Sequence, residues 1–312
     1  MKLRFPIRPR QRGFALLLVL ITVMVLSLIV AGLWESSQPG WEESALNQAR
    51  EQAGLLADSG INVAMHPSAA AGDLALRQTL APERSFVAVI TTEEGRFPIN
   101  RLGEERLRAS LLELFILWGL DAASANTASD SLSDWIDADS DPLPNGAEDG
   151  YYAGLEHPEF PPNVNFTSLD QLPFVAGMDR VAQVQPFYRD FFTLYSDGKI
   201  DLNAAPAQLI QAFTGATPDA ALNLVSVRNG GDGIVGTIDD YRFEDSGEVQ
   251  TLLGLDDAAW AEISTYATLA GTVKRIESTG TVGNFSETRI LLARETTSGG
   301  QTTRTPIAKF RK

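Results

Sequence analysis

The sequence contains no cysteine and only two histidines, His66 and His157. Without cysteine the chain can form no disulfide bond, no thiolate metal site and no cysteine nucleophile. Neither histidine lies in a metal-binding or triad motif, and the sequence has no phosphate-binding glycine loop and no nucleophile elbow. An enzymatic role would have to rest on paired carboxylates such as Asp134 and Asp137. We therefore expect that the chain is not an enzyme.

Positive charge is scarce outside the first residues. The chain has a formal charge of −15, to which residues 1–13 contribute five basic side chains and no acidic one, so the remainder carries −20. An acidic body of this kind repels nucleic acid and anionic lipid, and it suits divalent cations. A basic start before an apolar segment is typical of a cytoplasmic anchor. The two ends of the chain are expected to face different environments.

Charged residues are also absent from Phe14 to Trp34. About 20 apolar residues in a helix match the roughly 30 Å thickness of a bilayer core, so we predict one transmembrane helix. The run is too long for a secretory signal and lacks a small-residue cleavage site. An uncleaved signal anchor accounts for these features alone.

The basic leader meets this apolar helix through Gly13 and Phe14. This junction resembles the leader of type IV prepilins. The resemblance implies that prepilin peptidase cleaves after Gly13 and that the new amino group of Phe14 is methylated. Most pilins carry a glutamate five residues into the mature helix, where this chain has Leu18. Because an unpaired carboxylate in a bilayer costs about 2.5–3.5 kcal/mol or more, Leu18 suggests a subunit with no neighbour above it, at a filament tip.

Strand patterns flank the middle of the chain. We expect a break or a kink at Pro39-Gly40 and then an amphipathic helix over about 43–65. Ser85–Thr92 and Arg96–Asn100 are predicted to pair around the turn between them. The β pattern returns as a hairpin near the other end, with strands at Val273–Gly280 and Glu287–Ala293.

The region between these strands is predicted to be mainly helical. Apolar spacing predicts a helix over Glu104–Leu120, and Asn203 is predicted to cap a helix with Pro206 in its first turn. Leu172–Asp179 and Val249–Asp256 resemble helix-hairpin-helix elements, so a DNA-binding pilin-like protein is one alternative. Their acidic surroundings argue against contact with phosphate, and we expect packing roles and no nucleic-acid partner.

Four segments together resemble the minor pseudopilin K family of the type II secretion system: Asp134–Asp139, Asn145–Asp149, Leu172–Gly177 and Ile200–Pro206. The resemblance implies an α+β pseudopilin fold, in which a long N-terminal helix and a small antiparallel sheet carry a large, mainly helical insertion. It also implies calcium in the insertion and a tip complex with minor pseudopilins I and J. The expected location is the bacterial inner membrane, with one pass and a periplasmic C-terminal domain. Contact with the secreted protein cargo stays open.

On this basis the chain is divided into five predicted parts. They are a leader (1–13), a transmembrane helix (14–34), the helix continuation with the first strands (35–100), the inserted calcium-binding domain (101–270) and the C-terminal strands with a tail (271–312). The expected function is nucleation and capping of a pseudopilus that exports folded proteins across the outer membrane. A single-pass periplasmic calcium-binding protein with no filament role is the other alternative.

An acidic loop in the predicted insertion carries the candidate metal ligands. Its oxygen-bearing side chains fall at positions 1, 3, 5, 9 and 12 of an EF-hand-like count, but Pro142 stands where that motif requires glycine. We therefore predict Ca²⁺ in an irregular loop, and a solvated acidic loop is the alternative. The predicted ligands are Asp137, Asp139, Asp141, Asn145, Glu148 and Asp149.

A second acidic stretch contains Asp232, Asp239 and Asp240 among several glycines. Its spacing fits a metal loop and a plain glycine-rich turn equally well. Its role is left open.

Overall fold

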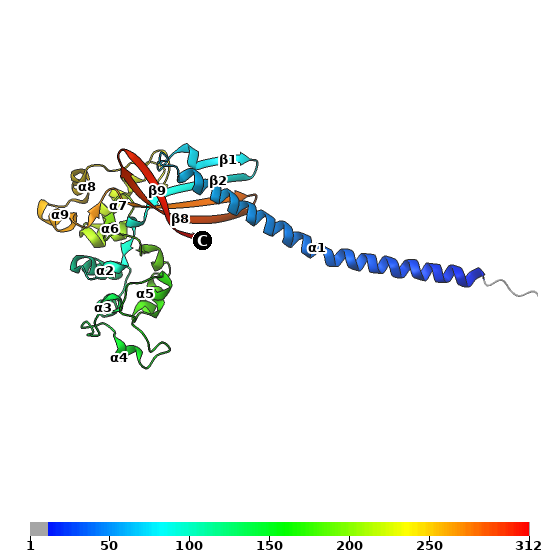
Figure 1. Cartoon of the computed structure of the whole chain (residues 1–312), viewed down its shortest axis with the longest axis horizontal. Helices are drawn as coiled ribbons and strands as arrows, with labels where there is room; N and C mark the ends of the chain where they lie inside the picture. The colour runs from blue at the N-terminus through cyan, green and yellow to red at the C-terminus, as the bar shows by residue number, and fades with distance from the viewer. Residues whose placement is uncertain (1–11, 312) are drawn as a thin grey trace, which may run out of the picture.

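The computed structural model describes residues 12–311 of the chain. Most of the predicted leader, residues 1–11, lies outside this part. A long helix, α1 (Arg12–Ala64), extends away from a body that consists of a sheet and a helical lobe (Figure 1).

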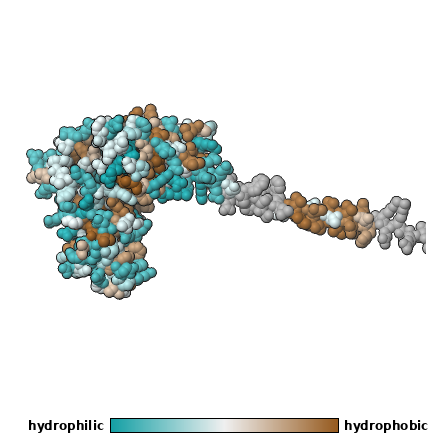
Figure 2. Space-filling model, viewed as in Figure 1, coloured by the Kyte–Doolittle hydropathy of each residue, from teal (hydrophilic) through white to brown (hydrophobic). Residues whose placement is uncertain are grey.

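Helix α1 has two different halves. Phe14–Gly32 is fully exposed, with a mean hydropathy of 3.1, and is long and apolar enough to cross a membrane. Figure 2 shows this segment as a hydrophobic rod beside a largely hydrophilic body. In the second half Ala53, Ala57, Ile61 and Ala64 recur every three or four residues and are buried against the sheet. The amphipathic continuation is therefore confirmed.

Of the break or kink predicted at Pro39-Gly40, the break is wrong, because α1 continues through both residues without ending, whereas the kink stays a prediction. Proline removes one backbone hydrogen bond of a helix, and this loss bends helices more often than it ends them when the turns on both sides are helical.

The main sheet has five antiparallel strands in the order β1-β2-β7-β8-β9. Their bounds are β1 (Arg77–Ala81), β2 (Arg84–Thr92), β7 (Val273–Val282), β8 (Phe285–Ser298) and β9 (Gln301–Arg311). Helix α1 packs on this sheet so closely that a Cβ atom at Gly280 would lie 2.0 Å from the carbonyl oxygen of Ala53. Only glycine permits this approach of helix to strand.

The predicted hairpin near the C-terminal end is confirmed as β7 and β8, which turn at Gly283 with φ +57°. The predicted pairing of Ser85–Thr92 with Arg96–Asn100 is wrong. Strand β2 pairs with β7, and the short β3 (Phe97–Pro98) pairs in parallel with β4 (Phe192–Thr193) in the lobe. A 3₁₀ turn over Glu93–Gly95 directs the chain away from the sheet, and Pro98 lacks the N–H that a regular ladder needs.

The lobe lies between β2 and β7 in the sequence and surrounds one large hydrophobic core. Besides β3 and β4 it contains the parallel pair β5 (Ile200–Asp201) and β6 (Ala267–Thr268). Short 3₁₀ turns, including Leu169–Phe174 and Tyr188–Phe191, connect its helices. Its α-helices are α2 (Glu105–Leu117), α3 (Ala122–Ile136), α4 (Asp149–Tyr152), α5 (Met178–Val184), α6 (Ala207–Thr214), α7 (Pro218–Arg228), α8 (Ser246–Leu253) and α9 (Asp257–Ser264).

The predicted helix over Glu104–Leu120 is confirmed as α2, which stops before Gly119 with φ +101°. The packing roles expected for the two hairpin segments are also confirmed, because Leu172, Val175 and Leu253 are buried. The predicted cap at Asn203 is wrong. Helix α6 begins at Ala207 after Pro206, too far along the chain for the Asn203 amide, which instead donates to the carbonyl oxygens of Phe243 and Leu269.

Candidate metal centre and lobe junction

Three carboxylates converge where α3 ends and α4 begins. Oxygen atoms of Asp134, Asp137 and Glu148 all lie within 4.8 Å of one another. Asp134 occupies the last turn of α3, Asp137 follows its final residue and Glu148 directly precedes α4. Asp134 is fully buried, Glu148 is 4% exposed and Asp137 is half-buried. We call these three residues the carboxylate cluster.

Within residues 12–311 the cluster lacks the partners that buried carboxylates need. Both oxygens of Glu148 and Oδ1 of Asp137 are buried without a hydrogen bond. Asp134 accepts from the amide of Leu143, at 3.2 and 3.3 Å, and from the backbone of Ala147. A Cβ atom at Gly146 would lie 1.9 Å from Oδ2 of Asp134, so the loop must carry glycine there to close over the cluster. Buried charges without partners are costly, and a cation would compensate them.

The same burial perturbs the acidity of the cluster. Burial, together with the charge of Asp134, raises the pKa of Glu148 to about 7. Burial raises the pKa of Asp134 to about 6, with a contribution from the charge of Asp137. Burial and the charge of Asp139 raise the pKa of Asp137. An oxygen-only set of acidic groups that repel one another fits a hard divalent cation such as Ca²⁺.

The structure places the predicted ligands in two groups. Asp137 and Glu148 belong to the carboxylate cluster, together with Asp134, which the sequence reasoning did not select as a ligand. The others are exposed on the loop: Asp139, Asp141, Asn145 and Asp149. The backbone amide of Asp141 donates to Oδ1 of Asp139 at 3.0 Å, and the Asn145 side chain donates to Asp130 at 3.0 Å. One helical turn separates Asp134 from Asp137, and that spacing is the signal that could have identified Asp134.

Neutral groups complete the surroundings of the cluster. Oδ1 of Asn163 is buried and has no hydrogen-bond partner in the described residues, while its Nδ2 donates to the carbonyl oxygen of Asp139. The indole of Trp135 stacks on Phe166 with 5.5 Å between ring centroids. This aromatic packing fixes the last turn of α3, and with it the position of Asp134.

The second acidic stretch forms a turn whose carboxylates bond within the turn itself. Asp239 accepts from the amide of Gly231 at 2.8 Å and from the hydroxyl of Thr237 at 2.7 Å, and the Thr237 bond lowers the pKa of Asp239. Asp240 accepts from the amide of Gly236 at 2.6 Å, and Asp232 accepts from the amide of Ile234 at 2.7 Å. These hydrogen bonds account for the acidic residues as turn formers.

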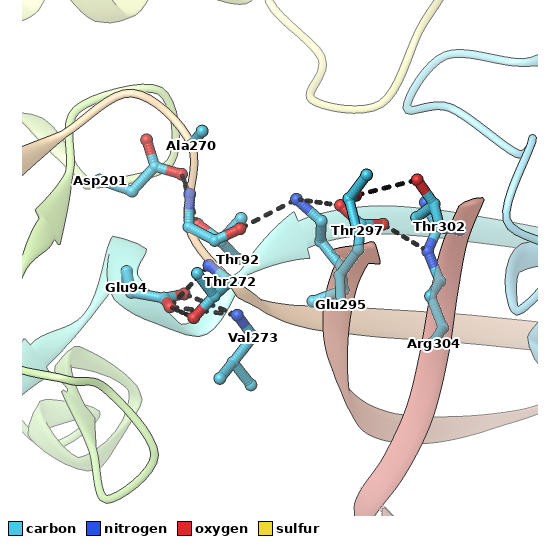
Figure 3. Close-up of polar contacts among 12 residues, drawn as sticks. Thr92, Glu94, Asp201, Ala270, Thr272, Val273, Glu295, Thr297, Thr302 and Arg304 are labelled. Carbon is cyan, nitrogen blue, oxygen red and sulfur yellow. Dashed lines mark hydrogen bonds and ion pairs between the residues drawn. The ribbon is translucent and has the colours of Figure 1, made fainter. Parts of the chain in front are cut away.

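A second group of buried carboxylates joins the lobe to the sheet. Glu94 accepts from the amides of Thr272 at 2.8 Å and Val273 at 3.0 Å, and Asp201 accepts from the hydroxyl of Thr92 at 2.7 Å and the amide of Gly271 at 3.1 Å (Figure 3). Glu94 and Asp201 are each 1% exposed. The segment that leaves the sheet after β2 and the segment that returns to it before β7 are therefore hydrogen-bonded to each other.

The fold and parts of the sequence match known proteins. Residues 95–187 match the family described as type II secretion system protein K. The type II secretion system protein K of Dickeya chrysanthemi is 42% identical over 67 residues, which cover 22% of this chain and 18% of that protein. Its counterpart from Pectobacterium carotovorum subsp. carotovorum is 27% identical over 203 residues, which cover 55% of this chain and 60% of that protein. The chain thus matches less than two thirds of either relative's length.

A solved structure shows the same fold. A chain in the crystal structure of the GspK-GspI-GspJ complex from the enterotoxigenic Escherichia coli type 2 secretion system matches with a TM-score of 0.60 at 16% identity. The match covers 89% of this chain and 99% of that chain. The shared fold, a long N-terminal helix and an antiparallel sheet with a large helical lobe, therefore extends over nearly the whole molecule. The family match over residues 95–187, the two relatives and the shared fold all show similarity to type II secretion system protein K.

Proposed function

We propose that this chain is a minor pseudopilin that caps and nucleates a pseudopilus, with a structural and not a catalytic role. The two halves of α1 carry this proposal. The first half is exposed and apolar, and the second half is buried against the sheet. The first half can therefore leave the lipid and pack on other apolar helices without disturbing the core between α1 and the sheet. The apolar half would cross the inner membrane once, with the acidic body in the periplasm.

Processing would free α1 for assembly. Cleavage between Gly13 and Phe14 by prepilin peptidase would remove five cations that hold the segment in the cytoplasmic leaflet. Methylation of the new Phe14 amine would follow. Leu18 supports a position at the filament tip, because a subunit without a neighbour above it has no amine to pair with a buried glutamate.

The partners in this proposal are minor pseudopilins I and J. The crystal structure with the same fold is that of a GspK-GspI-GspJ complex, which supports an equivalent assembly for this chain. The lobe is a bulky addition beside the sheet (Figure 1), and a terminal position has the lateral room for it.

Calcium is the proposed ligand of the carboxylate cluster. Asp134, Asp137 and Glu148 would hold it, and the unpartnered oxygens of Glu148 and Asp137 support the assignment. When bound, the cation would neutralise the repulsion among these groups and join the end of α3 to the start of α4.

Co-expression of the full chain with subunits I and J of its own system tests the assembly. We expect the tagged chain to co-purify with both subunits in mild detergent. As a control, a variant with Gly280→Leu disrupts the packing of α1 on the sheet and should lose both partners. Purification of the chain alone, with both subunits present and folded, would refute the proposed assembly.

A further inference from the structure

The outer part of the lobe carries a group of exposed apolar side chains close to the carboxylate cluster. Tyr151 is 54% exposed, Leu155 is 51% exposed and Phe174 is 46% exposed. His157 and Phe160 lie between them and are half-buried. We call these five residues the aromatic surface.

Three rings of the aromatic surface contact one another, and Tyr151 is linked to them through a buried ring. The His157 ring lies 5.1 Å from both Phe160 and Phe174, and Phe160 lies 5.6 Å from Phe174, measured between ring centroids. Through the buried Tyr152, Tyr151 connects to Phe160 with centroid separations of 5.0 and 6.3 Å. Single exposed apolar residues are normal on soluble proteins, but a connected group is typical of a contact surface.

This surface rests on a fixed base. Phe160 packs on the fully buried Trp135 with 4.8 Å between centroids, and the hydroxyl of Tyr152 accepts from the amide of Ala176 at 3.1 Å. The rings therefore lose little conformational freedom when they are covered, which favours binding.

The charge around the surface is one-sided. Residues 121–190 contain 13 acidic residues and two basic ones, Arg180 and Arg189, which lie 3.8 Å from the carboxylate of Asp179 and 2.8 Å from that of Asp170. Glu156 and Glu159 lie within the chain segment that forms the surface, and both are exposed. Nucleic acid and anionic lipid are repelled by such surroundings, whereas a basic polypeptide is attracted.

We propose that the aromatic surface is a docking site for a segment of another protein that presents an aromatic or aliphatic side chain flanked by lysine or arginine. The apolar side chain packs on Phe174 and Tyr151, and the flanking cations face Glu156 and Glu159. Complementary charge orients the segment, and ring packing supplies affinity. This proposal concerns a site separate from the cluster and from α1, and it does not depend on a filament role.

Peptide titration of the full chain in detergent tests the proposal. The probe is the labelled peptide Lys-Lys-Trp-Lys-Lys, compared with Lys-Lys-Ala-Lys-Lys and Glu-Glu-Trp-Glu-Glu, and the readout is fluorescence anisotropy. We expect the tryptophan-lysine peptide to bind about tenfold more tightly than either control. The combined change Tyr151→Ala and Phe174→Ala should weaken binding about tenfold. Phe310→Ala, which removes a ring of similar exposure (42%) on β9, should leave the affinity unchanged.

A charge variant tests the electrostatic part of the proposal. The combined change Glu156→Lys and Glu159→Lys alters exposed groups, of which Glu159 lies 3.3 Å from Nδ1 of His157, and should weaken binding of the tryptophan-lysine peptide about fivefold or more. Equal affinities for the three peptides, or an affinity that neither combined variant changes, would overturn the proposal.

Discussion

The carboxylate of Glu94 accepts a hydrogen bond from the backbone amide of Val273 at 3.0 Å, although 179 positions separate the two residues. Glu94 lies where the chain leaves the sheet for the lobe, and Val273 begins the strand by which it returns (Figure 3). These buried hydrogen bonds hold the base of the lobe against the sheet. Forces on the lobe can therefore reach the sheet and α1.

Replacement of Glu94 by glutamine should weaken this junction. Glu94→Gln keeps the size of the side chain but removes the charge that strengthens its bonds to Thr272 and Val273. We expect the free energy of unfolding to fall by about 2–3 kcal/mol, measured by denaturant titration of the full chain in detergent. Glu113→Gln on the exposed face of α2 is the matched control and should change it by less than about 0.5 kcal/mol. Equal stability of both variants would argue against a structural role for the Glu94 carboxylate.

Arg304 should be sensitive to the loss of its planar guanidinium. It donates to the carbonyl oxygens of Ala64, His66 and Ala69 at the end of α1, and to Glu295 at 2.8 Å. Lysine cannot make these bonds in several directions at once, so Arg304→Lys should lower the free energy of unfolding by about 2 kcal/mol. Hydrogen exchange should also become faster near the end of α1.

The control for this change is Arg294→Lys, at an exposed position of the neighbouring strand β8. A result in which both lysine variants exchange at the wild-type rate would mean that Arg304 does not hold α1 to the sheet.

Calcium should stabilise the chain through the carboxylate cluster. A ligand that binds only the folded state stabilises it by about 2.7 kcal/mol at a concentration 100 times its Kd. We therefore expect Tm to rise by several degrees when Ca²⁺ is added to metal-stripped protein. Glu148→Gln should remove most of this rise, whereas Glu113→Gln should retain it. A Tm that responds equally in both variants would locate the calcium effect elsewhere.

Without metal, the stability of the folded chain should fall as the pH rises from about 5 to about 8. The pKa of Glu148 is raised from 4.5 to about 7, and that of Asp134 is raised from 3.8 to about 6. The folded state thus holds more protons than the unfolded state in this window, so an increase in pH favours unfolding. Glu148→Gln should flatten the dependence, and saturating Ca²⁺ should do the same in the unaltered chain. Thermal melts across this range measure both, and a Tm that rises steadily with pH would contradict the assignment.

The sequence predicted the regular parts of the fold better than the parts that depend on distant contacts. The β7–β8 hairpin and α2 have strong local patterns, and both were found. Strand β9 was predicted only as part of a C-terminal tail. Its Thr-rich sequence contains Pro306 and most of its residues are exposed, so its pairing with β8 rather than its own pattern makes it a strand.

The same limit applies to the metal centre. The alternation of acidic residues identified the loop and two members of the cluster, Asp137 and Glu148. Asp134 lies inside helix α3 and not in the acidic loop. Its assignment as a ligand requires knowing where α3 ends and that the loop packs against Asp134 at Gly146. Asn203 illustrates the converse, because a residue typical of helix caps is used to fasten two distant backbone segments.

The N-terminus of the mature protein shows whether the chain is processed as a pseudopilin. Intact-mass and peptide mass spectrometry of the chain, isolated from the membranes of cells that contain its own prepilin peptidase, gives this end without assumptions about partners. The account predicts a chain that begins at Phe14 and carries one methyl group on its amine. A chain that still begins at Met1, in cells where other pseudopilins are processed, would contradict it.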